Sequence, residues 1–87
     1  MPTISYFLSL RIMMFWNDHN PPHFHVRADD GRKGIFDIEA LEMIEGDFKR
    51  KTQALILDWA ELHQAELLTD WELCRQKQTP NPIAPVE

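Results

Sequence analysis

Residues 4–16 read ISYFLSLRIMMFW, and the alternation in this stretch decides how the chain begins to fold. Every even position from Ile4 to Trp16 is apolar, whereas the odd positions begin polar at Ser5 and end apolar at Met13 and Phe15. A strict period of two predicts a β-strand with one buried face. Because this stretch is long for a single strand, we expect a bend or break near residue 9.

Two or three further strands are expected downstream of this stretch. Residues 23–28 alternate again and predict a strand antiparallel to the first. Residues 34–39 predict a third strand, with Phe36 and Ile38 pointing inward. A short fourth piece is expected at residues 41–44, before the break at 46–47.

The second half of the chain is predicted to be helical. From Lys49 onward, apolar residues recur three or four positions apart, which indicates a helix with one buried stripe. Asp47 is the expected N-cap. The pattern allows two helices with a kink near residues 64–69 or one bent helix, and Pro80 ends it.

Strands followed by helices indicate an α+β fold. We expect a small antiparallel sheet of three to four strands in the N-terminal half, covered by one bent or two C-terminal helices. Residues 1–79 are expected to form a single α+β domain, and residues 80–87 a Pro-rich, extended C-terminal tail.

Composition restricts the compartment and the class of protein. The chain has 87 residues, and 44% of them are hydrophobic, which suffices for one small packed core. The single cysteine, Cys74, cannot form an internal disulfide, as is usual in a reducing cytoplasm. We expect a cytoplasmic protein that has no secretory signal and does not enter the membrane.

The net charge of −5 is unevenly distributed. Residues 1–36 hold four basic and three acidic residues, whereas residues 37–87 hold five basic and eleven acidic residues. A uniformly acidic protein would repel nucleic acid, but the first part of this chain is weakly positive. The acidic part is expected to be a solvated surface or a face for a basic partner.

The strongest functional signal is residues 17–25, NDHNPPHFH, which hold three of the four histidines. Histidine exchanges protons near neutral pH and is the commonest metal ligand. Residues two apart on a strand share a face, so we expect the imidazoles of His23 and His25 to lie close together, with His19 folding back toward them. We predict His19, His23 and His25 as catalytic groups, with Asp18 orienting one imidazole.

Basic residues near this segment are candidates for substrate binding. Arg11, Arg27 and Lys33 are predicted to hold an anionic group such as a phosphate. Two other interpretations stay open. The three histidines could bind a divalent metal, although their spacing matches no strong zinc pattern, or the whole turn could be purely structural. His63 shares a helical stripe with apolar residues, so we interpret it as a core or boundary histidine.

The chain resembles, above all in residues 17–25, the bacterial family called domain of unknown function 4160. The similarity covers nearly the whole chain up to about residue 78. Two positions differ from the residues usual in that family: Ser9 stands where glycine is common, and Arg11 where an aliphatic residue is common. The matching segments are residues 1–4, 17–25, 36–38 with 45–46, and 59–63 with 71–72.

The resemblance implies a partner and a biological setting. Members of that family are typically encoded beside a protein of a second family, domain of unknown function 2442, in what resembles a toxin–antitoxin pair. This chain would be the toxin-like component, with RNA or a nucleotide as a target. The alternative is a non-catalytic adaptor or antitoxin-like binding module. Two copies could also pair through a sheet edge or the tail.

Overall fold

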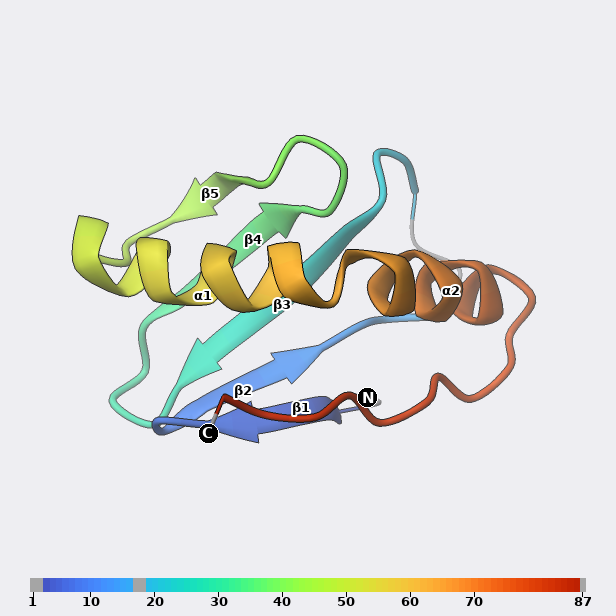
Figure 1. The fold of residues 1–87 in the computed structure, drawn as a ribbon, viewed down its shortest axis with the longest axis horizontal. Helices are drawn as coiled ribbons and strands as arrows, with labels where there is room; N and C mark the ends of the chain where they lie inside the picture. The colour runs from blue at the N-terminus through green and yellow to red at the C-terminus, as the bar shows by residue number, and fades with distance from the viewer. Residues whose placement is uncertain (1–2, 17–18, 87) are drawn as a thin grey trace.

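The computed structural model describes residues 3–16 and 19–86. Five strands form one antiparallel sheet in the order β1-β2-β3-β4-β5, so each strand pairs with its neighbour in sequence (Figure 1). Two helices follow. The expectation of three to four strands was too low, because residues 4–16 form two strands. The elements are β1 (Thr3–Phe7), β2 (Leu10–Met13), β3 (His23–Ala28), β4 (Lys33–Asp37), β5 (Glu42–Gly46), α1 (Arg50–Leu62) and α2 (Gln64–Arg75).

The chain reverses direction between β1 and β2 at a two-residue turn. Phe7 pairs with Leu10, and the intervening Leu8 and Ser9 have φ values of 50° and 61°. Two consecutive positive φ values are typical of the tight hairpin turn whose twist matches the flanking strands. The break expected near Ser9 is therefore a complete reversal of the chain.

Replacing Ser9 with glycine is expected to stabilise the protein by about 1 kcal/mol, because a side chain is unfavourable at positive φ. The matched substitution Ser5→Gly, within β1, is expected to lower stability, because glycine weakens an extended strand. Chemical denaturation of both variants measures the two signs. A Ser9→Gly variant less stable than the parent would contradict this account of the turn.

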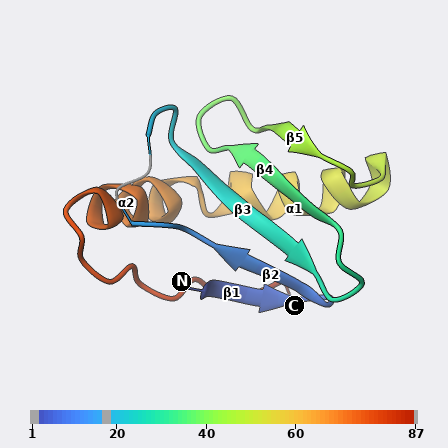
Figure 2. The same cartoon turned by 180° about the vertical axis from the view of Figure 1, so that it is seen from behind.

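Both helices lie against one face of the sheet, and the opposite face is open. Figure 2 shows the open face in front, with the helices behind it. Alternation along the strands sends Ile12, Phe24 and Phe36 into the core beneath α1, where each is fully buried. Ile56 and Trp59 of α1 complete the core from the helical side.

The helices are separated at His63, which ends α1 and precedes α2. Two helices were one of the predicted alternatives, although the break falls just before the expected region. The His63 ring packs on Trp59, with ring centroids 5.4 Å apart, and its Nδ1 lies 2.7 Å from a carboxylate oxygen of Glu66. The prediction that Asp47 caps α1 was wrong: the Asp47 carboxylate instead accepts the Lys33 backbone N–H, at 3.1 Å.

Residues 80–86 run back along the edge of the sheet and contribute to the same core. The Ile83 N–H donates to the Ile4 carbonyl oxygen at 2.7 Å, and the Ile83 side chain is buried. The Trp59 indole N–H donates to the Ala84 carbonyl oxygen at 2.9 Å. The tail therefore covers the outer edge of β1, which would otherwise expose its backbone groups.

A buried carboxyl group anchors the tail to α2. Asp70 is fully buried, and its Oδ1 accepts the Asn81 N–H at 2.8 Å. Its Oδ2 is also buried and has no hydrogen-bond partner among the described residues. Burial raises the pKa of Asp70, against the lowering effect of the Asn81 N–H, and the nearby Glu66 adds to the rise.

The raised pKa predicts how stability changes with pH. The folded state holds the Asp70 proton more tightly than the unfolded state, so this group makes stability fall as pH rises from about 4 through the folded pKa. Asp70→Asn keeps an oxygen for the Asn81 N–H but carries no charge. Denaturation curves measured across this pH range should show the decline in the parent and a flatter profile in the variant. Parallel profiles would contradict the assignment.

The single cysteine lies inside the core. Cys74 is buried, and burial, followed by the charge of Asp70, raises the pKa of its thiol to about 11. A thiol with this pKa stays protonated at neutral pH and is a poor nucleophile.

In the part of the chain that the structure describes, neither helix has the length and apolar character needed to cross a bilayer.

Candidate functional site

Three cations lie side by side across the open face of the sheet. Arg11 of β2 pairs with Arg27 of β3, and Arg27 pairs with Lys33 of β4. All three side chains are exposed, on the face opposite the buried Ile12 and Val26. Neighbouring strands lie about 4.8 Å apart, and like charges directly opposite one another are destabilising. We call these residues the cationic row; their arrangement is typical of a surface that binds an anion.

Each end of the cationic row carries a carboxylate held by a hydrogen bond. At the β1 end, the guanidinium carbon of Arg11 lies 5.9 Å from the centre of the Tyr6 ring. The Tyr6 hydroxyl donates to Asp29 at 2.8 Å, and this hydrogen bond raises the pKa of Tyr6. At the other end, Asp47 accepts the Lys33 backbone N–H. These contacts fix the strands that carry the cations.

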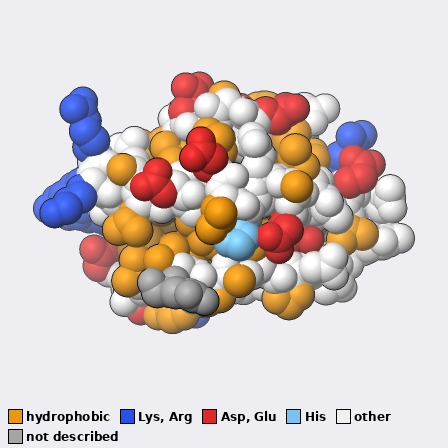
Figure 3. All heavy atoms as spheres, in the orientation of Figure 1, with side chains coloured by type: hydrophobic (Ala, Val, Ile, Leu, Met, Phe, Trp, Pro, Cys, Tyr) orange, Lys and Arg blue, Asp and Glu red, His pale blue; other side chains and the backbone are white. Residues whose placement is uncertain are grey.

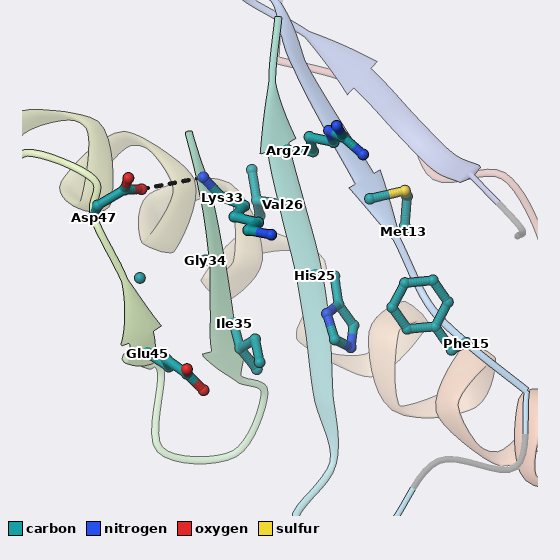
Figure 4. Close-up of a pocket in the computed structure, with 11 residues that line it drawn as sticks. Met13, Phe15, His25, Val26, Arg27, Lys33, Gly34, Ile35, Glu45 and Asp47 are labelled. Carbon is teal, nitrogen blue, oxygen red and sulfur yellow. Dashed lines mark hydrogen bonds between the residues drawn. The ribbon is translucent and has the colours of Figure 1, made fainter. Parts of the chain in front are cut away.

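A hollow of about 670 Å³ opens beside the row. Arg27 and Lys33 line one part of it, and His25 and Phe15 line another (Figure 4). The Phe15 and His25 rings lie against each other, with centroids 4.1 Å apart at 60°. Glu45, on β5, and Asp47, just after β5, form the acidic side. The hollow therefore brings two cations, an imidazole, an aromatic ring and two carboxylates together on an open surface.

The three predicted histidines lie close together, as expected. The His23 ring centroid is 5.2 Å from that of His25 and 6.2 Å from that of His19. Their exposures differ: His19 is exposed, His25 is half-buried and His23 is buried. The three imidazoles are therefore neighbours with unequal access to a ligand.

His23 is held by main-chain and aromatic contacts. Its Nδ1 lies 2.7 Å from the Pro21 carbonyl oxygen. Because a carbonyl oxygen only accepts, Nδ1 carries the hydrogen and donates it. The ring also packs on Trp71 of α2, with centroids 5.1 Å apart. These contacts indicate that His23 positions the turn and its two neighbouring imidazoles, whereas His25 is the imidazole that faces the hollow.

In the described part of the chain, no three His, Cys, Asp or Glu side chains are grouped so as to hold a metal ion. The hydrogen bond to the Pro21 carbonyl oxygen occupies the Nδ1 atom of His23. A divalent metal at His19, His23 and His25 stays a prediction, which elemental analysis of untagged protein tests. Asp18, predicted to orient an imidazole, lies outside the described residues.

Comparison with models of protein families identifies the family of this chain. The family model described as "Domain of unknown function (DUF4160)" matches residues 10–72. The chain belongs to this family. No curated protein and no solved structure matches it. Within this DUF4160 member, the matched segment runs from β2 to Glu72 of α2 and includes the cationic row, all four histidines and the hollow.

Sequence reasoning found part of this site. Arg27 and Lys33 were predicted as substrate-binding residues, and they line the same hollow as His25. Arg11, predicted with them, extends the row on the next strand. Phe15 and Glu45 were missed. Phe15 could have been found from the alternation that puts it on the same face as Arg11, whereas Glu45 depends on an irregular β4–β5 register that the sequence does not reveal.

Proposed function

We propose that this DUF4160 protein is the toxin-like component of a bacterial toxin–antitoxin module and acts in the cytoplasm on RNA or another phosphate-bearing target. Its cognate partner would be a protein of the domain of unknown function 2442 type. One observation carries the proposal: the cationic row lies in register on an open sheet face, directly beside His25. The proposed site is therefore the sheet face, whereas sequence reasoning had centred it on the histidine turn.

Binding would depend mainly on the cations. Arg27 and Lys33 would hold the phosphate oxygens by charge-assisted hydrogen bonds, and Arg11 would extend the contact along a polynucleotide. The ring of Phe15, in the same hollow, offers an apolar surface for a base. Acidic side chains lie mainly in the second half of the sequence, so the net charge of −5 does not describe the charge at this face.

The reaction we propose for RNA is phosphodiester cleavage with two imidazoles. His25 would take the proton from the ribose 2′-hydroxyl as its oxygen attacks phosphorus. The bond from phosphorus to the 5′-oxygen would break, and His19, as the general acid, would supply a proton to the departing oxygen. The cationic row would stabilise the charge that develops on the phosphoryl oxygens. His23, held by Pro21, would position the other two rings.

Expression of the chain alone is expected to slow the growth of the host cells. Co-expression of the proposed partner, a protein of the domain of unknown function 2442 type, should restore normal growth. His25→Ala should relieve the growth defect and lower the rate of RNA cleavage by about 100-fold or more. His63→Ala is the matched control, because His63 lies between the helices and contacts Glu66 and Trp59. Thermal melts must show that both variants are folded. A folded His25→Ala variant with full toxicity would refute the catalytic role.

A non-catalytic binding module is the second candidate, and the burial of His23 favours it. His23 is 6% exposed, donates to a main-chain carbonyl and packs on Trp71, which is a structural role. An adaptor or antitoxin-like protein would use the cationic row for binding alone. In that case purified protein would bind RNA without degrading it, and His25→Ala would leave binding and the growth effect intact.

A further inference from the structure

A second surface, on the helical side of the molecule, carries exposed apolar side chains that the proposed function does not use. Leu62 of α1 is 80% exposed, Leu8 of the β1–β2 turn is 61% exposed, and Leu55 of α1 is 39% exposed. Scattered exposed leucines are ordinary, but a contiguous apolar patch marks an interaction site.

Two hollows join the leucines along α1. One, of about 400 Å³, is lined by Leu8 and Leu55, and the other, of about 490 Å³, by Leu55, Leu62 and the tail residues Pro85 and Val86. Both include Leu55, so they meet there. We call the combined surface the α1 groove. Figure 3 shows hydrophobic side chains gathered between α1 and the C-terminal tail on this face.

The rim of the α1 groove is acidic. Asp29 and Asp30 line the hollow near Leu8, and Asp58 lines the hollow near Leu62. Arg32 is the cation in the lining of these hollows, and its Nε lies 3.7 Å from Asp30. Figure 3 shows further acidic side chains on this face, and a cluster of Lys and Arg side chains at one end of it. An occupant with basic side chains would be attracted to this rim, whereas a nucleic acid would be repelled.

The shape of the groove favours a helical occupant. One wall is α1, whose backbone N–H and C=O groups are hydrogen-bonded within the helix. A β-strand of a partner therefore could not pair with the backbone of this wall. From Thr52 to His63 the wall is about 17 Å long at 1.5 Å per residue, which matches roughly three turns of a second helix. A second copy of this chain is disfavoured, because groove-to-groove docking would bring two acidic rims together.

We propose that the α1 groove binds a basic amphipathic helix of a protein partner. Apolar residues of the partner helix, spaced three or four apart, would contact Leu55 and Leu62, and its lysines or arginines would face Asp58. This surface lies on the opposite side of the sheet from the cationic row. The inference therefore does not depend on the proposed function.

The test uses two synthetic helical peptides that share one leucine stripe and carry either lysines or glutamates at the polar positions. The lysine peptide should bind saturably by calorimetry, and the glutamate peptide should not. The double variant Leu55→Asp, Leu62→Asp should weaken binding of the lysine peptide by about tenfold or more. Ile44→Asp is the control, because Ile44 is half-exposed on β5, outside the groove.

Four results would overturn the proposal. The first is the absence of saturable binding by the lysine peptide, and the second is equal binding of the two peptides. The third is unchanged binding of the lysine peptide by the double variant, when thermal melts show that this variant is folded. The fourth is a dimer in sedimentation equilibrium that dissociates in the double variant but persists in Ile44→Asp, because a second copy would then occupy the groove.

Discussion

The triple variant Arg11→Thr, Arg27→Thr, Lys33→Thr is expected to bind a short single-stranded oligoribonucleotide at least about 100-fold more weakly than the parent while becoming more stable. Each lost cation removes charge-assisted contacts with phosphate. The slope of log K against log salt should also fall by about 2, because each phosphate contact to a single strand contributes roughly 0.7.

The gain in stability follows from the register of the same side chains. Arg27 lies directly opposite both Arg11 and Lys33, and two like-charged pairs disfavour the folded state. Threonine is well suited to an exposed strand position. The free energy of unfolding should therefore rise by roughly 0.5 to 1 kcal/mol. A variant that loses function while gaining stability is typical of residues retained for binding.

The control for net charge is a second triple variant, Lys49→Thr, Arg50→Thr, Lys51→Thr. These exposed cations lie at the start of α1 and not on the open sheet face, and their removal changes the net charge by the same amount. Binding should decrease much less in this control. Equal losses in the two triple variants would mean that only total charge matters, and the cationic row would lose its special role.

Phe24→Ala is expected to destabilise the protein by about 3 to 5 kcal/mol. Phe24 is fully buried at the centre of the sheet, stacks on Phe36 with centroids 5.5 Å apart, and meets Trp59 of α1 at 6.0 Å. The substitution removes the ring that joins sheet and helix. Because small domains have only about 5 to 15 kcal/mol of stability, much of the variant should be unfolded near physiological temperature.

Phe15→Ala provides the matched comparison for this prediction. Phe15 is only half-buried and lies on the open face against His25, so its removal should lower stability far less than loss of Phe24. Denaturant titration of both variants gives the two free energies. A loss below about 1.5 kcal/mol for Phe24→Ala would contradict the position of the core.

Periodicity predicted much of the fold because it reports burial directly. The alternation of residues 4–16 and 23–28 correctly indicated antiparallel strands, and helical spacing correctly indicated the second half of the chain. The β1–β2 reversal was predicted only as a bend or break, because Leu8 and Ser9 are not the glycine or asparagine residues that usually mark such a turn. The packing of Ile83 against β1 depends on distant partners, which local pattern does not reveal.

The candidate site was predictable in its residue types but not in its arrangement. The histidines were recognised from their density in the sequence, and they do lie together. The alignment of Arg11, Arg27 and Lys33 requires the register of three strands, which is fixed by turns and core packing. The burial of His23 depends on Trp71, far away in the sequence. The sequence therefore predicted a site centred on the histidine turn, and the strand register is what points to the sheet face instead.

The most direct test of the open-face site is a nuclear magnetic resonance titration of the isotope-labelled protein with a short single-stranded oligoribonucleotide. The account predicts saturable chemical-shift changes at Arg11, His25, Arg27 and Lys33, with little change in the α1 and α2 resonances. Unchanged spectra at saturating oligonucleotide, or changes confined to the helices, would contradict it.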